Sequence, residues 1–190
     1  MQEWFRTFEA WLKEASAHEA LAEAFTLSTV DVNSRVDARV LLYKGLMEGG
    51  LSFVTNYDSA KGQQLKSNDS GAMTFHWKSL SRQVRVRGKI LKGSADASDS
   101  YWKARPRGSQ LSGYCSPQSH VISSRKELEQ QIEALEVQYK GREIPRPENW
   151  GFYYLAPYQV EFWQGYENRF HERIQWRLVE GKWEQSLLAP

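Results

Sequence analysis

The sequence predicts a mainly β protein with flanking helices, in which antiparallel strands form a barrel. Short β-rich runs alternate with turn residues from position 25 onward, and most of the links between them are of hairpin length. Parallel strands need longer crossover connections, so this spacing favours an antiparallel barrel over a parallel sheet. We expect about seven or eight strands with three or four helices.

The length and composition indicate one globular domain spanning residues 1–190. The net charge of +2 is too nearly balanced to indicate a general polyanion binder, so any anion site must be local. A mean hydropathy of -0.65, with no apolar run of about 20 residues, predicts no membrane span. The single cysteine, Cys115, excludes an internal disulfide and a cysteine-based zinc site. No secretory signal is visible, and we expect a cytoplasmic protein.

The first half of the chain begins with a predicted helix over residues 1–18, because its apolar residues recur at helical spacing from 2 to 18. These are Trp4, Phe5, Phe8, Trp11, Leu12 and Ala15. A short helix is predicted at 59–67. Strands are predicted at 25–30, 36–43, 51–55, 72–77 and 83–91. In the last of these, Val84 and Val86 alternate with Arg85 and Arg87, which predicts one buried and one cationic face.

The second half begins with a helix at 94–104 that must end before Pro106. Residues 107–123 are rich in Ser and Gly without a period, which predicts a loop. The capping box Ser124-x-x-Glu127 opens a helix that Gly141 ends. The predicted C-terminal strands are 152–155, 159–164, 169–179 and a last strand containing Trp183.

The predicted strand 169–179 carries a row of cationic and protonatable groups. Residues two apart share a face, so Arg169, His171 and Arg173 are expected to project together. The opposite row is apolar and consists of Phe170, Ile174, Trp176 and Leu178. Such a row suits an anion or an electron-rich ring; the alternative is a solvated face neutralised by Glu167.

Other candidate anion-binding groups are dispersed along the chain. Lys61 lies at the start of a predicted helix, where backbone N–H groups and the helix dipole favour a phosphate. Tyr101, Arg105 and Ser109 follow at four-residue steps, and a guanidinium bonds two phosphate oxygens at once. Arg39 and Lys44 bracket a strand, on opposite faces because they are five residues apart.

Common catalytic motifs are missing from the sequence. It contains no zinc-ligand spacing, Walker loop, G-x-G-x-x-G or G-x-S-x-G, and its four histidines are scattered. This argues against hydrolase and kinase chemistry and predicts no metal site. The residue patterns alone therefore lead to a β-barrel with several separate anion sites and abundant aromatic residues.

Ten short segments of this chain resemble, in the same order, the sequence motifs of a known protein family. They are 39–44 (RVLLYK), 53–56 (FVTN), 59–62 (SAKG), 82–86 (RQVRV), 104–110 (ARPRGSQ), 116–119 (SPQS), 145–147 (PRP), 161–165 (EFWQG), 169–173 (RFHER) and 188–190 (LAP). Together they resemble the pyridoxine/pyridoxamine 5′-phosphate oxidase family across almost the whole chain. The C-terminal part, 159–190, carries the WQG and RFHER motifs.

The resemblance implies an FMN-binding split β-barrel that forms a homodimer with FMN at the interface. It implies oxidation of pyridoxine or pyridoxamine 5′-phosphate to pyridoxal 5′-phosphate, with O2 as electron acceptor and H2O2 as by-product. FMN and substrate each bring a phosphate, which would explain two separate sets of cations. We expect no nucleic-acid or membrane partner.

The resemblance also implies a role for individual residues. Those expected to bind FMN are Arg39, Lys44, Val54, Thr55, Lys61, Gln83, Gln118, Ser119, Trp163 and Arg173. Those expected to bind substrate are Lys44, Tyr101, Arg105, Ser109, Arg169 and His171. Arg169 and His171 would lie over the pyridine ring as the catalytic residues, with Arg169 aligning the reacting carbon.

The chain departs from the family pattern at a few positions. Ala60 stands where the family usually has Arg beside the lysine, which removes one cation from the implied FMN phosphate site. Two alternatives stay open. One is a related flavin oxidoreductase acting on another aromatic substrate, of the phenazine-biosynthesis type. The other is a non-catalytic module that binds FMN or pyridoxal phosphate.

Overall fold

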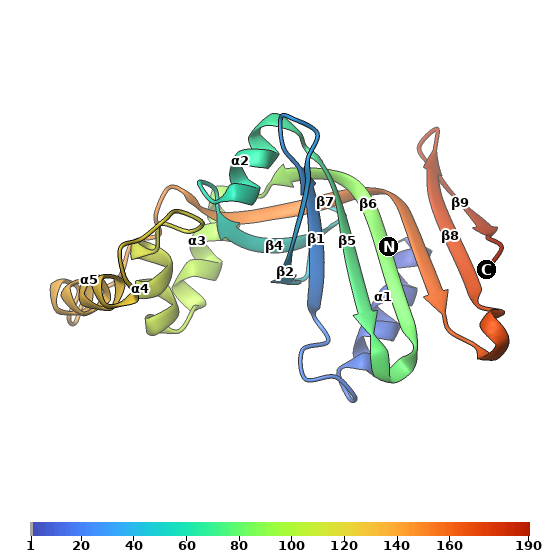
Figure 1. Cartoon of the computed structure of the whole chain (residues 1–190), viewed down its shortest axis with the longest axis horizontal. Helices are drawn as coiled ribbons and strands as arrows, with labels where there is room; N and C mark the ends of the chain where they lie inside the picture. Colours follow the sequence, from blue (N-terminus) through green and yellow to red (C-terminus); the bar gives the residue numbers. More distant parts are fainter. Residues whose placement is uncertain (1) are drawn as a thin grey trace.

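The computed structural model describes residues 2–190, and its centre is one antiparallel sheet flanked by helices (Figure 1). The hydrogen-bonded order is β2-β1-β5-β6-β7-β4-β3, and the β8–β9 hairpin adds to β7. Every strand pairing among the described residues is antiparallel, which confirms the predicted fold class. The strands are β1 (Ala24–Val30), β2 (Val36–Leu42), β3 (Leu46–Met47), β4 (Gly50–Asn56), β5 (Ser70–Trp77), β6 (Arg82–Lys92), β7 (Trp150–Gln164), β8 (Glu172–Val179) and β9 (Lys182–Leu187).

The helices cover one side and one end of this sheet. They are α1 (Glu3–Ala15), α2 (Ala60–Ser67), α3 (Ala95–Ala104), α4 (Arg107–Cys115) and α5 (Arg125–Gln138). Among residues 2–190 there are thus nine strands and five α-helices, compared with the seven or eight strands and three or four helices expected in total; two of the predicted strands merge into β7, and β3 and α4 were not predicted. Helices α3, α4 and α5 gather at one end of the molecule, and β8 and β9 lie at the other (Figure 1). None of the helices in the described part is long and apolar enough to span a membrane.

Strand β7 is the longest strand and joins the two ends. It pairs with β4 through 150–155 and with β8 through 159–164, while β6 runs along its other edge. The sequence predicted two strands here, and this was wrong, because a bulge opposite Gly88 carries the chain past Pro157 without breaking the ladder. A Cβ at Gly88 would lie 2.2 Å from the carbonyl oxygen of Ala156, so only glycine permits this approach.

The main core is aromatic and lies between the sheet and α1. The helix buries Trp4, Phe5 and Phe8, which confirms the face predicted from their spacing. The ring of Phe8 lies 4.9 Å from that of Phe75 on β5, in an edge-to-face arrangement. The Phe8 side chain therefore ties the helix to the centre of the sheet.

A second, smaller core belongs to the helical end. It contains Trp102, Leu111, Ile144 and Trp150, and thereby packs α3 and α4 against the start of β7. The sequence predicted a loop over 107–123, but residues 107–115 form α4, so this part of the prediction was wrong. Ser and Gly give this segment little helical propensity, and burial of Leu111 supplies the stabilisation instead.

Candidate functional site

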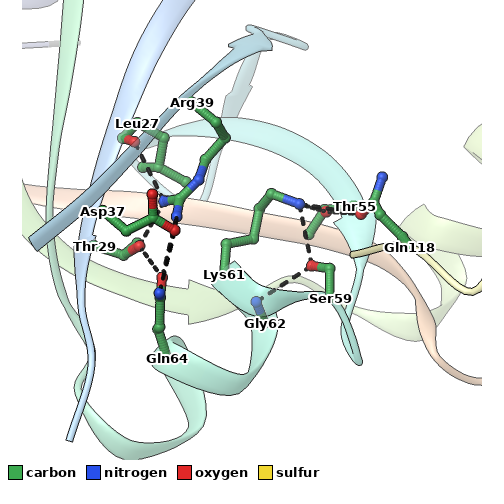
Figure 2. Close-up of polar contacts among 10 residues, drawn as sticks. All are labelled: Leu27, Thr29, Asp37, Arg39, Thr55, Ser59, Lys61, Gly62, Gln64 and Gln118. Atoms are coloured by element: carbon green, nitrogen blue, oxygen red, sulfur yellow. Dashed lines mark hydrogen bonds and ion pairs between the residues drawn. The ribbon is translucent and has the colours of Figure 1, made fainter. Parts of the chain in front are cut away.

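The buried amine of Lys61 is the centre of a polar cluster at the start of α2. Its Nζ donates to Oγ1 of Thr55, Oγ of Ser59 and Oε1 of Gln118, each at 3.1 Å (Figure 2). Lys61 is only 6% exposed, and among residues 2–190 no carboxylate forms an ion pair with it. Burial lowers the pKa of this amine to about 8, with a smaller contribution in the same direction from the charge of Arg39.

The start of α2 has the local structure that an anion site needs. Ser59 is the N-cap, and its side chain accepts a hydrogen bond from the backbone N–H of Gly62. A Cβ at Gly62 would lie 2.1 Å from the carbonyl oxygen of Tyr57, so the close turn before the helix requires glycine. The helix N-terminus adds a partial positive charge beside Lys61.

Arg39 of β2 lies next to this cluster and is held by neighbouring groups (Figure 2). Its guanidinium donates to Oγ1 of Thr29 at 2.5 Å and to Oε1 of Gln64 at 3.2 Å, and it forms an ion pair with Asp37. Asp37 offsets the charge of Arg39, so Lys61 supplies the uncompensated positive charge. Ala60, the first residue of α2, is exposed and adds none.

Arg105 follows α3 and projects into a cavity of about 310 Å³. Its guanidinium lies 4.5 Å from the ring centre of Trp150 and 5.3 Å from that of Trp102. The Nη1 atom is buried and has no hydrogen-bond partner among residues 2–190, and burial lowers the pKa of the guanidinium. A buried donor of this kind is costly unless a ligand satisfies it.

The same cavity joins the two predicted groups of residues. Thr55 and Gln118, which bind Lys61, line it together with Arg105 and Val54. The structure therefore brings a candidate cofactor cluster and a candidate substrate-binding cation into one space.

The other residues predicted to bind substrate or FMN in this region lie at different places around Arg105. Tyr101 stacks on Trp150 with ring centres 6.3 Å apart, beside the Arg105 guanidinium. Ser109 is half-buried in α4, and Ser119 lies in an exposed turn with φ of 72°. Lys44 lies two residues after the end of β2, and its backbone N–H donates a hydrogen bond to the backbone carbonyl of Ser52. Among residues 2–190, no hydrogen bond joins Lys44, Tyr101 or Ser109 to Arg105.

Three further predicted cofactor residues share one face of the sheet. Gln83 of β6 pairs with Trp163 of β7, and Trp163 pairs with Arg173 of β8. Cross-strand partners project to the same side, so the three side chains form a row. A planar ring flanked by an amide and a guanidinium suits a planar ligand with polar edges.

The loop before β8 differs from the prediction. Glu172 pairs with Gln164, so residues 165–171 form the connection between the two strands, and β8 begins only at Glu172. Arg169 lies in a short 3-10 turn with φ of 60°, exposed to solvent. The prediction that Arg169, His171 and Arg173 project together from one strand was therefore wrong, and only Arg173 is on the strand. In the opposite row Phe170 is 80% exposed and Leu178 is exposed, whereas Trp176 is buried.

His171 nevertheless lies beside the row of three. Its ring is 4.7 Å from that of Trp163, and its Nδ1 accepts the backbone N–H of Tyr166 at 3.1 Å. In the neutral imidazole this leaves the proton on Nε2. His171 and Arg173 both line an open cavity of about 790 Å³ at the β8 end of the molecule.

The two cavities lie far apart within one chain. The Arg105 cavity is lined by residues of β4, α4 and the loop after α4, and the His171 cavity by residues around the start of β8 and the C-terminus. Figure 1 shows α4 and β8 toward opposite ends of the molecule. One chain by itself therefore does not assemble the complete set of predicted residues.

Some residues of the site were missed by the sequence analysis. Ser59 bonds Lys61, Trp150 stacks on Arg105, and Glu161 binds Arg173. The N-cap preference of serine could have identified Ser59. The other two contacts join residues 45 and 12 positions apart, and no local pattern indicates them.

Two structural likenesses define the class of fold. PhzG from Burkholderia lata 383, solved with tetrahydrophenazine-1-carboxylic acid, has a TM-score of 0.94 at 24% identity, covering 100% of this chain and 94% of that one. A pyridoxamine 5′-phosphate oxidase-related, FMN-binding protein from Nostoc punctiforme has a TM-score of 0.82 at 18% identity, covering 100% and 99%. At these identities the likeness concerns the fold alone. The architecture is that of the split β-barrel proteins.

The family follows from sequence. Residues 12–139 match the family model described as pyridoxamine 5′-phosphate oxidase, and residues 150–190 match the pyridoxine 5′-phosphate oxidase C-terminal dimerisation region. The pyridoxine/pyridoxamine 5′-phosphate oxidase of Pseudomonas putida GB-1 is 48% identical over 98% of this chain and 88% of its own length. The protein of the same name from a Synechocystis strain is 46% identical over 98% and 87%. The chain belongs to the pyridoxine/pyridoxamine 5′-phosphate oxidase family and is an enzyme of that family.

Proposed function

We propose that the protein oxidises pyridoxine 5′-phosphate or pyridoxamine 5′-phosphate to pyridoxal 5′-phosphate, using FMN and O2 and releasing H2O2. The observation that carries the proposal is the cavity that joins the unpartnered Nη1 of Arg105 to the Lys61 cluster. Two adjacent cationic groups, each without an anionic partner in the described part of the chain, suit a pair of phosphorylated molecules. The family membership and the names of the relatives support the same reaction.

The residues present fit FMN. The partners of the buried Lys61 amine among the described residues are all neutral oxygens, as expected of a group that receives a phosphate. Arg39 and Gln118 would complete the binding of the phosphate and ribityl end, and Gln83, Trp163 and Arg173 would contact the ring system. Bound FMN would supply the two-electron acceptor for the substrate and then pass the electrons to O2.

The side chains of this chain would bind and orient the substrate. The free Nη1 of Arg105 would donate to the substrate phosphate, and the rings of Trp102 and Trp150 hold the guanidinium in place. The Nε2 proton of His171 would be offered to the pyridine ring, since Nδ1 is already engaged with the Tyr166 backbone. Arg169, exposed beside this group, would align the reacting carbon, as the family resemblance implies.

We infer that the complete site forms between two copies of the chain. The matched dimerisation region covers β7, β8, β9 and the loops between them, and these segments carry Trp163, His171 and Arg173. Lys61 is on α2, above the middle of the sheet, and Arg105 follows α3 at the helical end, so both elements lie away from β8 and β9 (Figure 1). In a two-fold dimer one chain would contribute the first group and its partner the second, with FMN between them.

An assay in air tests the reaction. The protein reconstituted with FMN should form H2O2 and pyridoxal 5′-phosphate in equal amounts from pyridoxine 5′-phosphate. Unphosphorylated pyridoxine should react with a much higher KM, because it lacks the group that Arg105 would bind. Equal KM values for the two compounds would contradict the assigned phosphate site, and no reaction with either would contradict the proposed substrate.

A further inference from the structure

A buried carboxylate lies on the sheet face that carries the proposed FMN residues. Glu161 of β7 is 4% exposed and is two residues from Trp163, so both side chains project from the same face. It pairs directly with Arg85 of β6, and Arg173 of β8 is its diagonal neighbour. A carboxylate is an unexpected group to find beside an anionic cofactor.

Both oxygens of Glu161 are used. Oε1 accepts from Nε of Arg173 at 2.9 Å, and Oε2 accepts from Nη1 of Arg85 at 3.3 Å. Glu161 is buried, whereas the Arg85 side chain is 47% exposed. Burying a carboxylate is costly unless it is paired and hydrogen-bonded, so this arrangement is held by the two arginines.

The Arg173 guanidinium is fixed at two of its three nitrogens. Besides the Nε contact with Glu161, Nη1 donates to the carbonyl oxygen of Ala189 at 2.8 Å. Because the guanidinium is planar, fixing Nε and Nη1 also fixes the direction of Nη2. Within residues 2–190 no hydrogen bond is made by Nη2, and Arg173 lines the open cavity at this end.

We propose that Glu161 is a positioning residue for FMN, which acts by holding Arg173 so that its free Nη2 edge faces the cofactor. The inference rests on the proposed function, in which Arg173 contacts the FMN ring system. In this role Glu161 favours FMN binding, although its negative charge by itself would disfavour it. As a simple charge, the carboxylate would repel FMN and its removal would tighten binding. As a positioning group, its removal would weaken binding.

Glu161→Gln distinguishes these roles because it keeps the side-chain volume and removes the charge. We expect the Kd for FMN, measured by quenching of flavin fluorescence on the folded protein, to rise about ten- to a hundredfold. Glu184→Gln is the matched control, since it makes the same charge change at an exposed position on β9 and should leave the Kd unchanged. Far-UV circular dichroism verifies that each variant is folded.

A double-mutant cycle shows whether Glu161 acts through Arg173. Arg173→Ala alone should raise the Kd for FMN, and adding Glu161→Gln to it should raise the Kd no further. If Glu161→Gln tightens FMN binding or leaves it unchanged while Arg173→Ala weakens it, the positioning role is wrong and the proposed function stands. If Arg173→Ala also leaves the Kd unchanged, the proposed FMN contact of Arg173 fails, and the role of Glu161 fails with it.

Discussion

The Nζ atom of Lys61 lies 3.1 Å from Oε1 of Gln118, although the two residues are 57 positions apart in the sequence. This contact joins the start of α2, on the barrel, to the loop that follows α4 (Figure 2). It also places the buried amine at the edge of the cavity that Arg105 enters. The proposed cofactor and substrate positions are thus adjacent, and Gln118 links the two parts of the fold by accepting hydrogen bonds from both Lys61 and Thr55.

The affinity for FMN should depend on the protonation of Lys61. Its pKa of about 8 lies below that of an ordinary lysine because of burial, so the charge that would bind the phosphate is lost as the pH rises through this value. Between pH 7 and pH 9 the protonated fraction falls about tenfold, and the FMN affinity should fall by up to this factor. Titrations of the protein with FMN at several pH values, followed by flavin fluorescence, measure this change in Kd.

Lys61→Met is the control for this dependence. It should bind FMN more weakly at pH 7 and show no further loss by pH 9. The same slope in wild type and in this variant would assign the titration to another group.

Ala60→Arg should tighten FMN binding. Residue 60 is exposed at the first position of α2, next to Lys61, and a guanidinium there would add a charge-assisted hydrogen bond to the phosphate. Such a bond contributes about 1.5–3 kcal/mol, which corresponds to about ten- to a hundredfold in Kd. Ala60→Gln, similar in length but neutral, should have little effect. Equal Kd values for the two variants would mean that the phosphate is bound elsewhere.

Arg105→Ala should raise the KM for pyridoxine 5′-phosphate about tenfold or more and leave FMN bound. The reason is the loss of the buried Nη1 donor that has no partner within the described chain. Arg105→Lys keeps the charge but loses the planar stacking on Trp150, so an intermediate KM is expected. The KM for unphosphorylated pyridoxine, measured by steady-state kinetics on the same variants, is the control, because it should change little. A KM for the phosphorylated substrate that stays at the wild-type value would remove Arg105 from the site.

Variants of the two cavities should complement each other in a mixed dimer. Arg105→Ala changes one cavity, and Arg173→Ala changes the other. If each site is formed by residues of both chains, a heterodimer of the two variants contains one site with both arginines intact. At a substrate concentration below the wild-type KM and an FMN concentration near the wild-type Kd, each variant alone should have little activity, and co-expression in equal amounts should restore about a quarter of the wild-type activity. Activity no greater than that of the separate variants would place the whole site within one chain.

Local sequence patterns predicted those elements that are stabilised locally. The alternation of Val84 and Val86 with Arg85 and Arg87 gave β6 and its buried face, because a strand has a period of two. Ser124 accepts the backbone N–H of Glu127, as the capping box requires. By contrast, α4 is held by packing of Leu111 and by contact between Tyr114 and Tyr139, which its Ser- and Gly-rich sequence does not reveal.

The candidate site was predicted only as separate pieces. The residue patterns indicated Lys61 and Arg105 as separate anion-binding candidates, and the family resemblance implied a role for each. The cavity that Arg105 enters beside the Lys61 cluster depends instead on how β4 packs against α4 and the loop after it. The RFHER segment has the alternation of a strand, and this pattern therefore predicted a strand that begins at residue 169. Residues 169–171 instead belong to the connection between Gln164 and Glu172. In this connection Asn168 has the left-handed conformation that asparagine tolerates.

The central claim is that bound flavin accepts electrons from a phosphorylated pyridoxine, and an anaerobic visible spectrum tests it most directly. The protein is reconstituted with FMN, freed of excess cofactor and mixed with pyridoxine 5′-phosphate in the absence of O2. We predict that the flavin band is retained by the protein, bleaches on addition of this substrate and returns when O2 is admitted. A retained band that does not bleach would contradict the proposed substrate, and a protein that retains no flavin would contradict the proposed cofactor site.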